Sequence, residues 1–347
     1  MRFLLIMALL TGFIIAGSSF TSESLRRQYS RPSSAWPRPW VDAGVEWKEL
    51  GILPSSPVDM RVDSLRQLAR LGAMLFFDTR LSGAGRISCA SCHQPEKSWT
   101  DGRSKSLGHE DQENKRNSPT ILNVWGYTRL FWDGRSSGLE DQAFAPINSE
   151  SEMHSDIREL PARLRKLRQY RELFDSVYPG EGIDPDKIAA ALATFQRTIV
   201  SDSSAFDRFL AGDRKALDNP QLRGLHLFRT KARCMNCHHG PLLTDNQFHQ
   251  TIFSGNDIGR YMQTHVDADS GRIRTPSLRD VVYTGPWMHD GKETSLAEII
   301  RKYESQVGTD PLLHDIRLSP REKKDLLAFL QAISAPPPPF NKPVLPE

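Results

Sequence analysis

Apolar residues recur at the spacing of an α-helix over much of this chain. Between residues 62 and 76, Leu65, Leu68, Leu71 and Leu75 fall on one helical face. Residues 156–177 and 184–200 carry the same amphipathic pattern over longer stretches. Signals for β-strands are few and short. The pattern therefore predicts a mostly α fold.

Short polar signals mark where two further helices begin. Ser295-x-x-Glu298 has the form of a capping box, and Leu296, Ile299, Ile300 and Tyr303 follow on one face. Ser319-Pro320-x-Glu322 marks a second start, because Pro is favoured in the first helical turn. The Pro-rich segments 31–39 and 335–346 are predicted to be extended straps or linkers.

The N-terminus has the composition of a secretory signal peptide. Arg2 precedes an apolar stretch over residues 3–16, and the small residues Gly17, Ser18 and Ser19 follow. The stretch is shorter than the ~20 apolar residues that span a bilayer. We predict a signal peptide over residues 1–19 and a periplasmic protein without stable membrane insertion after cleavage. An uncleaved signal that serves as an anchor is the alternative.

Length and charge narrow the class of protein. A chain of 347 residues is expected to form about two domains. The net charge is only +3, from 45 basic and 42 acidic residues. This balance gives no reason to expect nucleic acid as a partner.

All four cysteines of the chain lie in two Cys-x-x-Cys-His runs, which are residues 89–93 and 234–238. This spacing is typical of haem c attachment, where two thiols bind the porphyrin and the histidine binds the iron. One such run could equally be a redox dithiol or half of a zinc site. Two runs with no cysteine left over favour two covalent haem c groups, held by Cys89, Cys92, His93, Cys234, Cys237 and His238.

An internal repeat relates the two halves of the chain. Residues 116–122 resemble 274–278, and the Trp132-Asp-Gly-Arg135 segment resembles His289-Asp-Gly-Lys292. Leu139 and Leu296 follow at the same distance. The repeat predicts two tandem cytochrome c-like domains, one haem in each. We place an N-terminal extension at 20–60, the domains at 61–215 and 216–335, and a Pro-rich tail at 336–347.

The two iron sites differ in the residues that could lie opposite the histidines. Tyr303 is a candidate ligand for the second haem, although from periodicity alone a core tyrosine explains its position better. Gln142, Pro146 and Glu152 follow the Trp132 segment in the first half. A lone Gln or Glu is usually a surface residue. Beside an open iron, a carboxyl group could move a proton between peroxide oxygens and an amide could donate a hydrogen bond.

The chain resembles the bacterial dihaem cytochrome c peroxidase and MauG (methylamine utilisation) superfamily, in particular its MauG-like branch. The resemblance runs from about Leu65 to Ser334. It rests on an ordered set of segments, namely both Cys-x-x-Cys-His runs and residues 116–120, 131–135, 243–249, 274–278 and 286–291.

The resemblance implies roles for several residues. The first haem would be high-spin and would react with peroxide, with Gln142 and Glu152 beside it and Pro146 shaping the pocket. Trp132 would relay electrons between the haems; a core aromatic is the alternative. By the same resemblance, one Ca²⁺ would lie between the domains, bound by Asn117, Thr284 and Pro286; oxygen ligands suit this ion.

Two further positions divide the branches of the superfamily. Tyr303 stands where the peroxidases place a methionine ligand of the second haem and MauG-like proteins place a tyrosine. His109 stands where some peroxidases keep a displaceable ligand that closes the first haem at rest. A surface histidine on a polar loop explains His109 equally well.

These features lead to three functional hypotheses. The first is a periplasmic dihaem c oxidoreductase, a peroxidase that uses H₂O₂ to oxidise a protein or small-molecule donor through a high-spin haem and a His/Tyr-ligated second haem. The second is a conventional cytochrome c peroxidase that removes H₂O₂ with electrons from a small cytochrome. The third is an electron-transfer cytochrome without catalysis, which would need no acid–base group at the iron.

Overall fold

The computed structural model describes residues 22–304, 310, 312 and 316–346. The predicted signal peptide lies outside these residues. The fold is mostly helical, as the sequence predicts, and none of the described helices is both long and apolar enough to span a bilayer. The helices are α1 (Ser22–Tyr29), α2 (Asp63–Phe77), α3 (Cys89–Cys92), α4 (Leu139–Asn148), α5 (Leu160–Arg165), α6 (Arg168–Val177), α7 (Pro185–Arg197), α8 (Ala205–Leu210), α9 (Asn219–Arg229), α10 (Tyr261–Thr264), α11 (Leu296–Glu304) and α12 (Pro320–Ala332).

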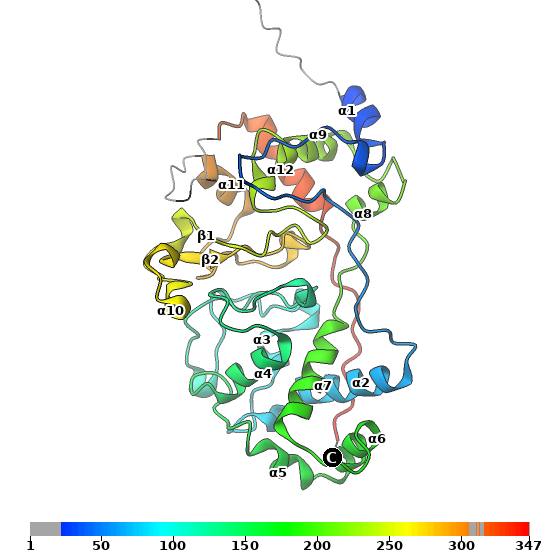
Figure 1. The fold of residues 1–347 in the computed structure, drawn as a ribbon, viewed down its shortest axis with the longest axis vertical. Helices are drawn as coiled ribbons and strands as arrows, with labels where there is room; N and C mark the ends of the chain where they lie inside the picture. Colours follow the sequence, from blue (N-terminus) through cyan, green and yellow to red (C-terminus); the bar gives the residue numbers. More distant parts are fainter. Residues whose placement is uncertain (1–21, 305–309, 311, 313–315, 347) are drawn as a thin grey trace, which may run out of the picture.

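Strand structure is limited to one short hairpin in the described residues. Strands β1 (Phe248–Gln250) and β2 (Arg272–Arg274) pair antiparallel, with Phe248 opposite Arg274. The hairpin and α10 project from one side of the molecule, between its upper and lower parts in Figure 1.

Most of the predicted helices are confirmed, and one is corrected. Helices α2, α7, α11 and α12 lie where the pattern places them, and α12 begins with the expected capping box at Ser319 and Glu322. The segment 156–177 forms two helices, α5 and α6, because Leu167 adopts an extended backbone between them. The break redirects the chain so that Tyr170 of α6 donates a buried hydrogen bond to Asp78 (2.7 Å).

The buried apolar side chains form two separate clusters, one in each half of the molecule. The first core includes residues from Leu71 to Ile199, and the next core residue along the chain, Phe206, belongs to the second core. Each core contains one tight helix crossing. A Cβ on Gly72 of α2 would lie 1.8 Å from the Ala191 carbonyl of α7, and a Cβ on Gly224 of α9 would lie 2.0 Å from the Asp325 carbonyl of α12. Both crossings therefore require glycine.

The two ends of the described chain cross to the opposite halves. The N-terminal segment places Leu25, Tyr29 and Trp36 in the second core before the chain reaches α2 (Figure 1). Its Glu49 forms an ion pair with Arg229, which is fully buried. The C-terminal tail returns to the first half, so that each half is completed by a segment from the far end of the chain.

Phe340 anchors this tail in an aromatic cluster of the first core. Its ring stacks on Phe77 with centroids 5.6 Å apart, and it meets Trp99 edge-on at 5.0 Å. At the end of the tail, the Pro346 carbonyl accepts a hydrogen bond from Arg80 (2.6 Å). The segments predicted as extended straps are thus part of the packed structure.

The sequence repeat corresponds to a repeated turn. Trp132-Asp-Gly-Arg135 is flanked by the pair Leu130 and Ser136, and His289-Asp-Gly-Lys292 by the pair Trp287 and Glu293. The residue before each motif and the glycine within it have positive φ, namely Phe131 and Gly134, Met288 and Gly291. Both aspartates accept a hydrogen bond from the backbone N–H two residues later. One local structure is therefore built twice.

The repeated segments contact one another reciprocally. The N–H of Asn117 donates to the His289 carbonyl (2.7 Å), and the N–H of Arg274 donates to the Trp132 carbonyl (2.9 Å). Asn117 is related to Arg274, and Trp132 to His289, by the same offset along the chain. Such an exchange of equivalent bonds is the mark of an approximate twofold relation between two units. The rings of Trp132 and His289 meet there, 6.4 Å apart.

Candidate functional site

Both Cys-x-x-Cys-His runs fold so that the histidine ring is held by a backbone carbonyl. Nδ1 of His93 lies 3.1 Å from the Trp99 carbonyl, and Nδ1 of His238 lies 3.0 Å from the Leu243 carbonyl. Burial lowers the pKa of both imidazoles, which favours the neutral ring. A neutral imidazole that donates from Nδ1 presents Nε2 as an unprotonated ligand atom.

Desolvation by the surrounding protein dominates the environment of all four cysteines. Burial raises the pKa of Cys89 and of Cys234 to about 12, and that of Cys92 to about 11. Redox dithiols have lowered thiol pKa values instead, because the thiolate is the reactive form. The environment of these cysteines therefore gives no support to the redox-dithiol alternative.

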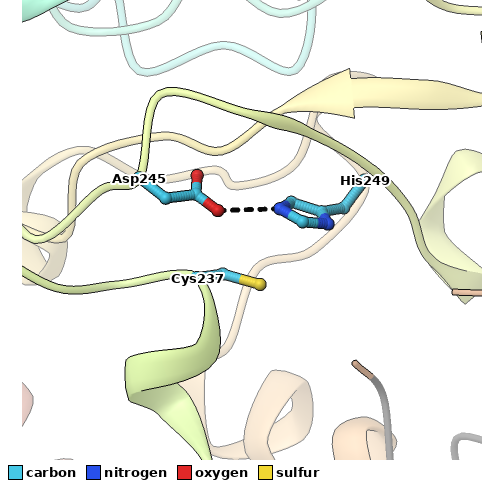
Figure 2. A group of neighbouring side chains, drawn as sticks. All are labelled: Cys237, Asp245 and His249. Atoms are coloured by element: carbon cyan, nitrogen blue, oxygen red, sulfur yellow. Dashed lines mark hydrogen bonds and ion pairs between the residues drawn. The ribbon is translucent and has the colours of Figure 1, made fainter. Parts of the chain in front are cut away.

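The zinc alternative is tested by one group of side chains in the second half. Cys237, Asp245 and His249 place their ligand atoms within 4.8 Å of one another (Figure 2). His249, however, is hydrogen-bonded at both ring nitrogens, to Asp245 (2.8 Å) and to Asp310 (2.9 Å). Burial opposes the charge, but these two bonds raise the pKa of His249 to about 12. A protonated imidazole has no lone pair for a metal, so we interpret the group as an ion-paired cluster.

The first cavity encloses about 730 Å³ and brings together most of the residues predicted for the first haem. His93 and both cysteines of α3 line it, and Gln142 and Pro146 of α4 lie in the same wall. Pro146 lies inside the helix and lacks an N–H, so the carbonyl of Gln142 loses its helical partner.

Glu152, on the loop after α4, also lines the first cavity. Its side chain is half-buried, and burial raises the pKa of its carboxyl group, with Arg135 acting in the opposite direction. This environment allows the carboxyl group to hold a proton nearer neutral pH than an exposed glutamate would. The cavity therefore contains a group suited to proton transfer.

The second cavity encloses about 260 Å³ and contains His238 and Tyr303. Tyr303 lies on α11, and its ring is 5.2 Å from that of Phe253. Burial is the main cause that raises the pKa of its phenol. The second cavity thus contains the phenol of Tyr303, the residue predicted from the sequence as a ligand.

One relation between the cavities was missed in the sequence. The offset that relates Trp132 to His289 and Leu139 to Leu296 also relates Pro146 to Tyr303. Helices α4 and α11 begin at equivalent residues and line the two cavities. Proline therefore stands in the first half at the position that carries the phenol in the second. The repeat could have been followed from Leu139 and Leu296 to this pair.

Trp132 and Asn117 lie in the wall that the two cavities share. The indole of Trp132 is buried, and its Nε1 donates to the Asn117 carbonyl (2.8 Å). Thr284 and Pro286 line the second cavity, as Asn117 does. The side-chain amide of Asn117 donates to the Arg103 carbonyl (3.0 Å), while the Thr284 hydroxyl donates to the Val281 carbonyl (3.4 Å). The residues predicted to bind calcium thus all line the second cavity.

His109 is not brought together with His93. Gly108 lines the first cavity, whereas His109 is outside its wall and stacks on His154, with ring centroids 4.2 Å apart and planes at 7°. The backbone N–H of His109 donates to the Glu152 carbonyl (2.8 Å). In this arrangement, His109 supports the loop that carries Glu152.

The two cavities fit haem on their own residues. Each combines two thiols with a histidine whose Nε2 is left free of the backbone bond, and each has apolar walls. In the shared wall, the buried guanidinium of Arg274 has no ion pair with any described carboxylate, as expected beside an anionic cofactor.

Comparison with known proteins agrees with this chemistry. Residues 66–215 match the model of the di-haem cytochrome c peroxidase family. The methylamine utilization protein MauG of Methylophilus methylotrophus is 39% identical over 287 residues, covering 80% of this chain and 86% of its own. The cytochrome-c peroxidase IdrP1 of Pseudomonas sp. strain SCT is 36% identical over 323 residues, covering 82% and 85%.

A solved structure extends the similarity to the fold. A MauG-like protein associated with microbial copper homeostasis superimposes with a TM-score of 0.72 at 30% identity, covering 85% of this chain and 95% of that one. The similarity to the relatives covers both halves and both Cys-x-x-Cys-His runs. The chain belongs to the di-haem cytochrome c peroxidase family and is a two-haem peroxidase.

Proposed function

We propose that the chain is a periplasmic dihaem c oxidoreductase that uses H₂O₂ to oxidise a protein or small-molecule donor, in the manner of MauG-like proteins. Each half would be a cytochrome c-like domain with one covalent haem, bound through Cys89, Cys92 and His93 or through Cys234, Cys237 and His238. The observation that carries the proposal is the pairing of Pro146 with Tyr303. It leaves the first cavity without a side-chain ligand at the position where the second cavity has one.

Glu152, Gln142 and Pro146 of the first cavity would have different roles in the reaction with peroxide. A haem iron with one open position would supply the oxidant-binding centre. When bound, the haem would supply the electrons that cleave the O–O bond, and Glu152 would move a proton from one peroxide oxygen to the other, so that the second could leave as water. Gln142 would donate a hydrogen bond to the peroxide, and Pro146 would keep a competing side chain out of the site.

Trp132 and Tyr303 would pass on and hold the second of the two oxidising equivalents that peroxide supplies. Trp132 lies in the wall common to both cavities, so an indole separates the two haem sites. Tyr303 would bind the second iron as a phenolate, a hard anion that favours the ferric state over the ferrous one. Asn117, Thr284 and Pro286 would hold one Ca²⁺ near this wall through oxygen atoms.

Electron paramagnetic resonance of the as-isolated ferric holoprotein, before and after stoichiometric H₂O₂, tests the proposal. We expect one high-spin and one low-spin ferric signal, and the loss of both signals after peroxide. Tyr303→Phe should change the low-spin signal and leave the high-spin one. Two low-spin signals that peroxide leaves unchanged, in resting and in pre-reduced protein, would reject the enzyme and favour an electron-transfer cytochrome.

The similarity to IdrP1 favours a second candidate, a conventional cytochrome c peroxidase. In that case a small cytochrome would supply the electrons that reduce H₂O₂ to water. Steady-state oxidation of reduced cytochrome c by the holoprotein, at a rate that Tyr303→Phe leaves unchanged, would favour this alternative. His109 would then be examined as a ligand of the resting first iron.

A further inference from the structure

Arg274 is a buried cation whose charge has no partner in the part of the chain that the structure describes. Only 3% of the residue is exposed. Its Nε donates to the Phe131 carbonyl (3.2 Å), its Nη1 donates to the Thr275 carbonyl (3.4 Å), and the guanidinium lies 3.7 Å from the centre of the Tyr127 ring. These are neutral contacts, and none supplies a negative charge.

Other buried arginines of this protein show what such a group normally requires. Arg229 is paired with Glu49, and Arg279, whose side chain is 2% exposed, is paired with Asp207 at 2.8 Å. An unpaired buried charge is strongly destabilising, because it has lost its hydration without gaining a partner. Arg274 should therefore have an anion that the polypeptide does not provide.

Most carboxylates in the cavity walls already have partners, and Glu152, which lines the first cavity, forms no ion pair with Arg274 in the described residues. Asp133 is bound by Arg116 and Arg135, and Asp257 is bound by Arg116 as well. Asp310 is bound by His249. These three acids are thus paired with other cations, and Arg274 has no carboxylate partner among the described residues.

The place of Arg274 identifies the missing anion. It lines the first cavity and the second. Each haem carries two propionate groups, and the guanidinium fork matches a carboxylate in geometry and charge. We propose that Arg274 binds a haem propionate at the wall between the two cavities and sets the electrostatic potential there.

Arg274 is hydrogen-bonded to the Trp132 segment through both its backbone and its side chain. The backbone N–H of Arg274 donates to the Trp132 carbonyl, and its side-chain Nε donates to the carbonyl of Phe131, the residue before Trp132. A propionate held by the guanidinium would therefore be fixed relative to the indole between the haems. Arg274 is a positioning residue for this relay as well as a cofactor-binding residue.

Spectroelectrochemical titration of both haems in the holoprotein, without peroxide, tests the proposal. A positive charge near a haem favours the reduced iron, so Arg274→Gln should shift the midpoint potential of at least one haem to a more negative value. Arg274→Lys keeps the charge and should retain most of the wild-type potential. Arg279→Gln is the matched control, since Arg279 is equally buried but lines neither cavity.

Unchanged potentials in Arg274→Gln, or an equal shift in Arg279→Gln, would overturn the proposal. If Arg274→Gln fails to assemble, a crystal structure of the wild-type holoprotein decides the question. We expect a propionate oxygen within hydrogen-bonding distance of the guanidinium, and a longer separation for all propionates would refute the assignment. The inference rests on the two haems alone, so the failure of the peroxide chemistry would leave it intact.

Discussion

Glu152 illustrates how the surroundings of a single side chain prepare it for chemistry. The Glu152 carboxyl group is half-buried in the wall of the first cavity, and this burial raises its pKa. The neighbouring Glu150 is exposed and lies outside that wall. Because the two glutamates are close in sequence but differ in burial, Glu150 is a matched control for Glu152.

Glu152→Gln should slow the reaction of the holoprotein with H₂O₂ by about 10²-fold or more, the usual contribution of a positioned acid–base group. Deprotonated Glu152 is the form that accepts the first proton, so the wild-type rate should rise with pH through a pKa above the usual glutamate range. Stopped-flow absorbance across pH measures both effects. Glu150→Gln should behave as wild type; equal slowing in both variants would contradict the assigned role.

His249 gives a pH-dependent contribution to stability. Its pKa is raised from 6.5 to about 12 in the folded state, so the stabilisation is complete below pH 6.5 and is lost as the pH rises through about 12. His249→Gln should lower the free energy of unfolding by about 3 kcal/mol near pH 6, and by less at alkaline pH. Chemical denaturation at several pH values measures this, with exposed His265→Gln as the control. A deficit that grows with pH would exclude the ion-paired imidazolium.

At the scale of elements, the sequence predicted much of the framework because the relevant signals are local. The apolar spacing and caps of α2, α7, α11 and α12 lie within the helices themselves. The break at Leu167 was not predicted. It accompanies a hydrogen bond between Tyr170 and the distant Asp78, which no local signal in the sequence reveals. The reciprocal bonds of Asn117 and Arg274 were also beyond prediction, since each joins segments from different halves.

Pro146 lies inside helix α4 and lines the first cavity, and it should lower the free energy of unfolding of the protein. Pro146→Ala restores the hydrogen bond to the Gln142 carbonyl and should raise the free energy of unfolding by up to about 3 kcal/mol, the cost of an interior helical proline. Pro161 lies in the first turn of α5, where proline is tolerated, so Pro161→Ala should change little. Denaturant unfolding of both variants measures the difference. Equal effects would show that the position of Pro146 is not strained.

At the scale of the whole molecule, the two cores depend on segments from the opposite ends of the chain. The segment with Leu25, Tyr29 and Trp36 packs on the second core, and the tail with Phe340 packs on the first. The aromatic cluster around Phe340 includes Trp99, whose carbonyl meets Nδ1 of His93. The tail therefore packs close to the histidine of the first haem site.

Phe340→Ala should lower the free energy of unfolding by about 2 kcal/mol, a value in the range expected for a partly buried aromatic side chain. The first half should lose stability before the second, because the ring packs on Phe77, Trp99 and Phe195. Hydrogen exchange resolved by peptide measures where protection is lost. Val344→Ala serves as the control, since Val344 is 88% exposed. Loss of protection confined to the second half would contradict the packing.

The crossing of the ends has a consequence for biosynthesis. A ribosome makes the first core early, yet the Phe340 ring that packs on it follows α12 of the second core along the chain. The N-terminal segment, made before either core, finds its surface only after α9 and α12 have emerged. The half that is synthesised first is therefore the half whose core packing is completed last.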